Sequence, residues 1–466
     1  MSSVLTFFGI TSVLTIIYFI LYRYRFSIKR MFSGSRTLTG MTSVAFALVA
    51  TQIGGATVMG TSQEAYSSGW YGLLYIIGVS IGFLILGSGL AFRMKALNIS
   101  CSADLFEHKY HSILLKKIAS LLSIMTIGGL LIGEIIASKG LLEGLGISNG
   151  IFFILFWISI IMYTVLGGLN AIGINSNYQL AFIMIVFTGI FGYCLWQEPS
   201  TFFTLSALTT QQSTFSPGAT DLYTLISSLL MPALYCIVEQ DAAQPFFNVS
   251  TKRSALLTSL AAVLVMLLFS LVPLYFGMKA KLLNVALPNG ASPIIPVLAL
   301  LTNKIVVVLA LCGMIIAIIS TVDFLMRAIT STIDVDFDFI APTIDKATRS
   351  QLVMIVIGIG ALASSYCVAS KVVQILIYSY ELYDSCLVVP ILAGYFKKDL
   401  KKDAAIGSVA FGFLSFILLR VIPVPLPTEI VSIGLSWIGY QIGDKTEVFK
   451  RIRLFVRALR ARPCSV

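Results

Sequence analysis

Hydrophobic positions in this chain run in blocks of about 20 residues, separated by short polar stretches. A block of that length, wound as an α-helix, crosses the roughly 30 Å of hydrocarbon in a bilayer. The alternation of a membrane β-barrel is not visible, and an isolated strand in lipid leaves its backbone unpaired. The pattern predicts an all-α polytopic membrane protein with about 13 transmembrane helices, near 4–22, 41–61, 68–92, 116–138, 149–168, 177–196, 222–243, 254–278, 304–333, 351–368, 372–396, 403–421 and 425–442.

Composition supports the membrane class. Of the 466 residues, 57% are hydrophobic and only 11% are charged, whereas about 25% of the residues of a soluble domain are charged. The mean hydropathy is +0.93. A soluble core this apolar could not be covered by polar surface, which excludes an ordinary soluble enzyme.

The net charge of +11 is distributed by side of the membrane rather than gathered into a nucleic-acid site. Basic residues cluster in Arg23–Arg36, Lys397–Lys402 and Lys445–Arg462, and the segment 197–221 has none. By the positive-inside rule this predicts a multi-pass protein of the cell (inner or plasma) membrane, with the N-terminus outside and the C-terminus cytoplasmic. The basic segments then lie beside anionic lipid of the bilayer. Nothing in the sequence indicates a nucleic acid or an obligate protein partner.

Two predicted spans are interrupted at mid-depth. The span near 41–61 contains Gly54-Gly55, and the span near 222–243 runs into Glu239-Gln240-Asp241 and then Pro245. A pair of broken helices at corresponding points of two halves is typical of an inverted-repeat transporter with its site near the midplane. Such backbone is tolerated at membrane depth only where it lines a cavity. The alternative is that the glycine pair merely allows two helices to pack closely.

Several short runs follow one another in a recognisable order. Together, over roughly residues 30–400, they resemble the sodium:solute symporter family, which includes the proline, pantothenate, choline and sugar symporters. The runs are Phe32–Arg36 with Ala50–Gly55, Asp104–Tyr110, Tyr163–Leu169, Gln240–Gln244, and Ser320–Asp323 with Ser331–Thr332. The resemblance implies sodium-coupled uptake of a small organic solute (an amino acid, quaternary amine or carboxylate-like solute) by alternating access, and no enzymatic activity.

The resemblance also implies a LeuT-type core of five plus five inverted helices and a division of the chain into four parts. Residues 1–40 would hold an extra transmembrane helix and a basic inside loop. Residues 41–196 would form the first inverted repeat and residues 197–400 the second. Residues 401–466 would hold two extra helices and a basic inside tail.

The sodium site that the resemblance implies has five members, and Na⁺ is the co-transported ion. The members are the backbone oxygens of Ala50, Ile53 and Ala317 and the hydroxyls of Ser320 and Thr321. The chemistry agrees, because a hard cation prefers oxygen ligands, and positions i, i+3 and i+4 share one helix face. The alternative is that the two hydroxyls only hydrogen-bond back to their own helical turn.

The solute site is expected between the two broken helices. Gln52 and Glu239 would supply polar side chains, and Gly54 and Gly55 would give access to the backbone. The sequence departs from the family at Asn175-Ser176, where a Thr-Asp pair is usual. Because a carboxylate is missing there, we expect one sodium per solute.

Ionisable residues inside spans are costly and often functional. Asp323 and Arg327 stand at i and i+4, which predicts a structural ion pair, and Glu134 lies alone in the span near 116–138. Glu381 and Asp384 lie among tyrosines, which would suit an amine or quaternary ammonium solute through cation–π contact. The equally open alternative is that these tyrosines, Tyr378, Tyr380 and Tyr383, pack beside lipid or a neighbouring helix.

Two functions from other classes compete. Asp334, Asp336 and Asp338 could hold magnesium and a diphosphate, as in polyprenyl-diphosphate transferases, but Asp345 is the only nearby acid for a second cluster and lies in the same loop. A passive channel would not need two broken helices together with a hydroxyl-bearing helix face.

Overall fold

The computed structural model describes residues 41–97, 102–147, 149–167, 174–198, 219–239, 251–287, 291–337, 345–368, 371–422 and 426–445, with isolated positions between them. Within these ranges every regular element is a helix, as the hydrophobic blocks predict. The predicted span near 4–22 and most of the basic tail lie outside the described residues.

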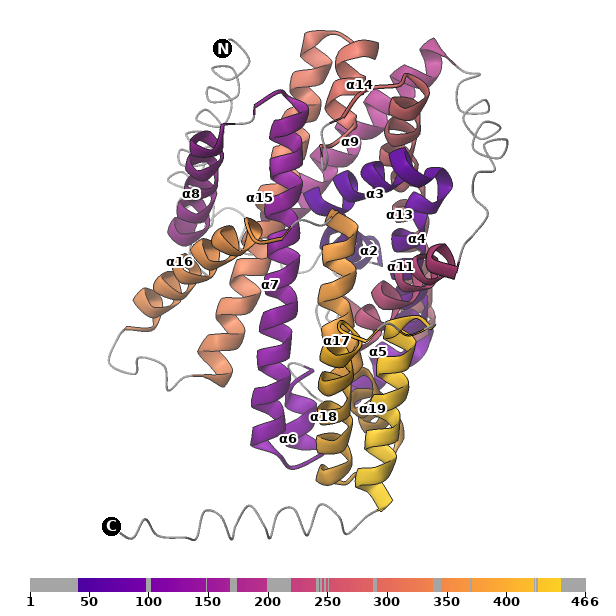
Figure 1. Cartoon of the computed structure of the whole chain (residues 1–466), viewed down its shortest axis with the longest axis vertical. Helices are drawn as coiled ribbons and strands as arrows, with labels where there is room; N and C mark the ends of the chain where they lie inside the picture. The colour runs from indigo at the N-terminus through magenta and orange to yellow at the C-terminus, as the bar shows by residue number, and fades with distance from the viewer. Residues whose placement is uncertain are drawn as a thin grey trace.

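The helices are packed side by side into one body (Figure 1). Seven described helical segments are long and apolar enough to cross a membrane, and two shorter apolar helices accompany them. The figure of about 13 spans therefore stays a prediction. The helices are α2 Met41–Gln52, α3 Gly55–Ser68, α4 Leu74–Ile85, α5 Ala91–Ala96, α6 Asp104–His108, α7 Ile113–Gly144, α8 Gly150–Gly167, α9 Ile174–Gln197, α11 Ala219–Val238, α13 Lys252–Leu282, α14 Ile294–Leu301, α15 Lys304–Asp336, α16 Lys346–Ser365, α17 Val372–Phe396, α18 Lys402–Leu418 and α19 Thr428–Lys445.

The longest helices form the frame on which the site is built. Helix α7 runs nearly the height of the molecule beside α17, with α8 and α16 on one side and α4, α11 and α13 on the other (Figure 1). Helices α15 and α17 both contact α7, and α11 packs between α4 and α17. This arrangement places the first helix pair, α2 and α3, against the middle of the bundle.

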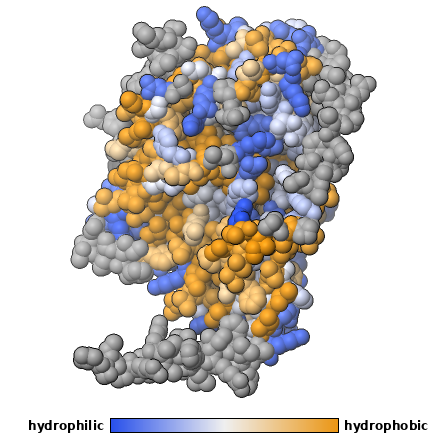
Figure 2. Space-filling model, viewed as in Figure 1, coloured by the Kyte–Doolittle hydropathy of each residue, from blue (hydrophilic) through white to orange (hydrophobic). Residues whose placement is uncertain are grey.

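The outer surface suits lipid. Figure 2 shows apolar residues over much of the face in view. Large apolar side chains point outward, including Ile151 (71% exposed), Ile185 (73%) and Trp196 (80%). In water the exposure of these apolar side chains would be unfavourable, whereas beside acyl chains it costs nothing. Polar groups are instead placed in the interior, where they can find hydrogen-bond partners.

The two last helices pack through small residues. The hydroxyls of Ser408 on α18 and Ser436 on α19 lie 2.9 Å apart. A Cβ added at Gly439 would lie 2.8 Å from the Phe411 side chain. Lipid tails are as apolar as the helices, so close contact of this kind is what holds such helices together.

Candidate ion and solute site

The predicted span near 41–61 is interrupted where the glycine pair predicts it. Helix α2 ends at Gln52 and α3 begins at Gly55. The N–H of Gly54 donates to the carbonyl of Gln52 at 3.1 Å, which diverts it from Ala50, its usual partner in an α-helix. Among the backbone hydrogen bonds that described residues make across this break, none ends on the carbonyl of Ala50 or Ile53. These two oxygens are therefore available to a cation.

Helix α15 presents a second set of oxygens. The carbonyl of Ala317 accepts a hydrogen bond from Ser320 Oγ at 2.9 Å and another from Thr321 Oγ1 at 3.0 Å. This is the back-bonding that the alternative interpretation expects. A hydroxyl that donates its proton still has lone pairs for a cation. The geometry thus gathers three oxygens on one turn and is compatible with both interpretations.

The break and α15 meet at Gly54. A Cβ added to Gly54 would lie 2.5 Å from Thr321 Oγ1, and one added to Gly55 would lie 3.2 Å from the Cα of Ile318. Only glycine allows the two backbones to approach this closely. The structure therefore brings the Ile53–Gly54 turn directly against the hydroxyl-bearing face of α15.

Glu134 of α7 lies at the same break. Its Oε2 accepts a hydrogen bond from the N–H of Ala56 at 3.0 Å, and its side chain is buried, with Glu134 only 2% exposed. Its Oε1 would lie 2.9 Å from a Cβ on Gly54. The carboxylate therefore lies at the N-terminus of α3, where the helix dipole favours negative charge.

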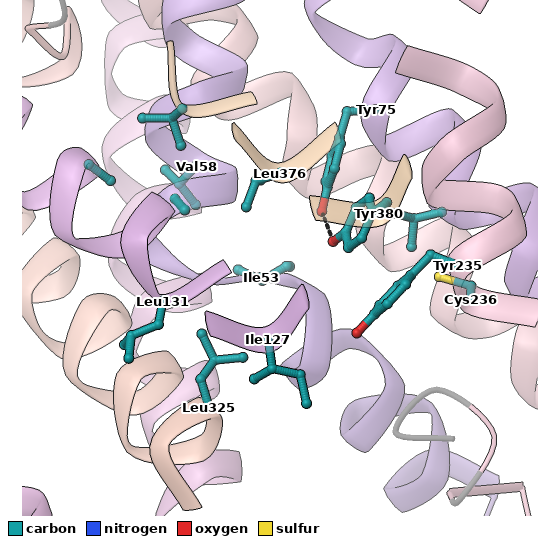
Figure 3. Packing of buried hydrophobic residues seen from close by; sticks show 14 of the residues in the cluster. Ile53, Val58, Tyr75, Ile127, Leu131, Tyr235, Cys236, Leu325, Leu376 and Tyr380 are labelled. Carbon is teal, nitrogen blue, oxygen red and sulfur yellow. Dashed lines mark hydrogen bonds between the residues drawn. The ribbon is translucent and has the colours of Figure 1, made fainter. Parts of the chain in front are cut away.

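A pocket opens between the break and α17. Its lining includes Gln52, Gly54, Glu134 and Thr321, together with Tyr75, Tyr235 and Tyr380. The hydroxyls of Tyr75 and Tyr380 lie 2.8 Å apart, and the rings of Tyr235 and Tyr380 stack with centroids 4.2 Å apart. Figure 3 shows these three tyrosines gathered from separate helices beside Ile53 at the break. The pocket thus joins freed backbone, one carboxylate and an aromatic wall.

The family model of sodium:solute symporters matches residues 31–412. The chain belongs to the sodium:solute symporter family. The sodium/pantothenate symporter of Escherichia coli (strain K12) is 31% identical over 168 residues, which is 34% of this chain and 34% of that relative. The match therefore spans about a third of the relative's length.

Solved transporter structures share the fold of this chain. A Na⁺-coupled sialic acid symporter in a substrate-bound outward-open state aligns with a TM-score of 0.68 at 17% identity, over 90% of this chain and 92% of that one. A nucleobase-cation-symport-1 family transporter in a closed conformation aligns with a TM-score of 0.50 at 12% identity, over 86% of this chain and 91% of that one. These neighbours have the LeuT-type fold, and they are transporters rather than enzymes.

The structure places the predicted solute-binding residues of the symporter in two groups. Gln52 is 7% exposed and lines the pocket with Gly54, while Gly55 lies behind it against Ile318. Glu239 is buried at the end of α11, one residue beyond Val238, and is not among the residues that line the pocket. Gln240 and Asp241 lie outside the described residues.

The charged residues inside the predicted spans have different partners and lie at different distances from the pocket. Arg327 Nη2 lies 2.6 Å from Asp323 Oδ1, the contact that the i, i+4 spacing predicts. Glu381 does not reach the pocket: it pairs with Arg420, whose guanidinium lies 4.2 Å from the ring centroid of Tyr378. Of the acid and aromatic residues predicted on this helix, only Tyr380 lines the pocket; Asp384 is fully buried, and the ring of Tyr383 packs against Tyr235.

The acidic run of the competing enzyme hypothesis has structural partners. Asp334 pairs with Arg349, with Oδ1 and Nε 3.0 Å apart. Asp336 accepts a hydrogen bond from Ser120 at 2.6 Å. Asp345 accepts one from the N–H of Ala347 at the start of α16. Asp338 lies outside the described residues. Within the described part of the chain, no group of three or more His, Cys, Asp or Glu residues is placed to hold a metal ion.

Proposed function

We propose that this symporter couples the downhill entry of sodium to the uptake of a small organic solute by alternating access. The observation that carries the proposal is the contact between the interrupted α2–α3 segment and α15. It joins two carbonyls that the break releases from helical hydrogen bonding to a turn with three further oxygens. Membership of the family supports the same coupling ion.

Sodium is proposed to bind between the carbonyls of Ala50, Ile53 and Ala317 and the hydroxyls of Ser320 and Thr321. Five oxygens around a hard monovalent cation resemble the oxygen-rich shells of other hard cations. Ala317 is 2% exposed and Ile53 is 4% exposed, whereas Ala50, Ser320 and Thr321 are partly exposed, so the site is buried on one side and reachable on the other. Binding at a contact between two helices gives sodium a means to favour one conformation over another, because the ligands separate if the helices do.

The solute is proposed to lie in the adjacent pocket, against Gln52 and the exposed backbone at Gly54. Gly55 keeps the break close to α15, and Glu239 at the end of α11 begins the polar run Glu239-Gln240-Asp241 that the sequence predicts as the break of the second repeat. Sodium and solute would then share the Gln52–Gly55 segment. A shared segment explains coupling, because each ligand orders backbone that the other needs.

One sodium per solute follows from the residues at hand. The side chains of Asn175 and Ser176 carry no charge to balance a second cation, and Asp323 is paired with Arg327. The proposed frame has residues 41–196 and 197–400 as the two inverted repeats, with about three extra spans and the N-terminus outside.

The direct test is uptake of a panel of radiolabelled solutes into proteoliposomes, with and without an inward sodium gradient. We expect accumulation above equilibrium that disappears when sodium is replaced by potassium. Equilibration without accumulation would favour the passive channel. Uptake that follows a proton gradient and ignores sodium would overturn the choice of coupling ion.

A further inference from the structure

The N-terminus of α3 is the positive end of a half-helix at membrane depth. In transporters with interrupted helices, such an end points at an anionic group of the substrate. Here the protein fills that position itself. The N–H of Ala56 donates to Glu134 Oε2 at 3.0 Å, and the carboxylate is packed against Gly54 and Gly55. A solute carboxylate would therefore find its docking position occupied and a like charge beside it.

The charge of Glu134 is not balanced by a nearby basic residue. Among the ion pairs of the described residues, none includes Glu134. Its only hydrogen bond within the described part is the one from Ala56. Of the residues that line the pocket, Glu134 alone has a carboxyl or a basic side chain. An isolated buried carboxylate is costly, so a counter-charge brought by a ligand is favourable.

The remaining wall of the pocket is aromatic. Tyr235 and Tyr380 stack on each other, and the hydroxyl of Tyr380 is engaged with that of Tyr75. Because the hydroxyls of Tyr75 and Tyr380 bind each other, these two rings meet a solute with the faces and edges that stacking leaves open, beside the buried hydroxyl of Tyr235. The faces of aromatic rings attract cations, including quaternary ammonium groups.

We propose that the solute of this symporter is a cationic amine, from a primary to a quaternary ammonium, and that Glu134 is the counter-charge that selects it. The inference rests on the proposed function and narrows its substrate class. It predicts a preference different from that named for the pantothenate and sialic acid symporters to which the chain is similar, since those two solutes are carboxylates.

The competing explanation is that Glu134 serves sodium alone. Gly54 lies against both Thr321 and Glu134, so the carboxylate is close to the proposed ion site as well. The two explanations differ in what Glu134→Gln removes. If Glu134 is a partner of sodium only, Glu134→Gln should change sodium binding and leave the choice among solutes unaltered. If Glu134 is a counter-charge for the solute, the same substitution should change that choice.

The experiment measures ligand-induced thermal stabilisation of the purified full-length protein, in NaCl and in KCl. The amine probes are methylammonium, tetramethylammonium and choline. The matched neutral probe is 3,3-dimethylbutan-1-ol, which has the shape of choline without its charge, and the anionic probes are pantothenate and acetate. Binding of ²²Na⁺ without solute is measured in parallel, and bound amines are then followed as uptake at zero membrane potential.

We expect sodium-dependent binding of at least one amine, at least tenfold tighter than the binding of 3,3-dimethylbutan-1-ol. We expect no binding of the carboxylates. Glu134→Gln should reduce that tenfold preference to near unity, whereas Glu134→Asp should retain most of it. Glu143→Gln, on the same helix but outside the pocket lining, is the matched control and should behave as the wild type.

Several outcomes would overturn the inference: sodium-dependent binding of a carboxylate, binding of no amine, or an amine preference that survives in Glu134→Gln. If the wild-type protein still binds ²²Na⁺ in any one of these cases, the proposed function stands. Wild-type protein without any ²²Na⁺ binding would instead contradict the proposed function. If Glu134→Gln fails to fold, the inference is tested by Glu134→Asp and by whether the wild type prefers amines to the neutral and anionic probes.

Discussion

Removing the two hydroxyls of α15 is the sharpest test of the sodium site. The double variant Ser320→Ala, Thr321→Ala deletes two of five proposed ligands and keeps the carbonyl of Ala317. It also keeps the helix, because alanine is the best helix former. The close contact at Gly54 is relieved rather than tightened, since Thr321 Oγ1 is the atom that a Cβ on Gly54 would meet first.

The magnitude follows from the kind of contact that is lost. An interaction of a neutral oxygen with a charged group contributes about 1–2 kcal/mol net. Two such losses amount to about 2–4 kcal/mol. Each 1.4 kcal/mol is tenfold in affinity, so the sodium concentration for half-maximal uptake should rise about thirtyfold at the lower estimate and several hundredfold at the upper one.

The assay is sodium-dependent uptake in proteoliposomes, accompanied by ²²Na⁺ binding to the purified protein. The same helix offers a matched control in Ser331→Ala, Thr332→Ala. Thr332 Oγ1 donates to the carbonyl of Ala328 at 3.0 Å, the distance found between Thr321 Oγ1 and the carbonyl of Ala317. The control therefore removes one threonine with an equivalent back-bond, together with the serine before it, from a position away from the break.

If the hydroxyls only hydrogen-bond back to their own turn, the two double variants should both retain the sodium dependence of the wild type. That result would refute the assignment of Ser320 and Thr321 as ligands. A large shift in both variants would show that the effect comes from the helix and not from the site.

Three further predictions concern the break, the ion pair and the coupling ratio. Gly55→Ala should abolish uptake in a folded, inserted protein, because its Cβ meets α15 and Glu134, whereas Gly128→Ala, whose Cβ meets nothing within 4 Å, should transport normally; equal uptake by both would contradict the close contact. Asp323→Asn should lower the thermal midpoint, since it removes the carboxylate that pairs with the 3% exposed Arg327, at a cost of up to about 3–5 kcal/mol, and Asp323→Leu with Arg327→Met should recover most of it; a single variant as stable as the wild type would argue against the pair. At zero membrane potential, a tenfold sodium gradient should concentrate the solute about tenfold if one sodium moves with each solute molecule and about a hundredfold if two do. A sodium-to-solute ratio near two would make Asp323 the first candidate for a second sodium site.

Features that depend on neighbours in sequence were predictable. The glycine pair marked the break, the i, i+4 spacing of Asp323 and Arg327 marked their contact, and blocks of apolar residues marked the long helices. In each case the physical rule acts within one helix, so the sequence alone carries it.

Features that join distant residues were not predictable. Glu134 stood out only as an acid inside a span, and its partner Ala56 lies 78 residues away. Glu381 was grouped with the tyrosines of its own helix, but its partner Arg420 lies 39 residues further along. The packing of helices decides such pairs, and no single helix contains the information. The aromatic wall was partly missed for the same reason, because Tyr75 and Tyr235 come from other helices.

The position of Glu134 has a consequence for how the protein can evolve. The group that fills the positive end of α3 belongs to α7, whereas the proposed sodium ligands belong to α2, the break and α15. On the proposed assignments, the charge of the solute and the coupling ion are recognised by different helices. A single replacement at Glu134 by a small neutral residue would reopen the helix end to carboxylates without touching an ion ligand. A lineage with this architecture can change the sign of its cargo in one step and keep the same energy source.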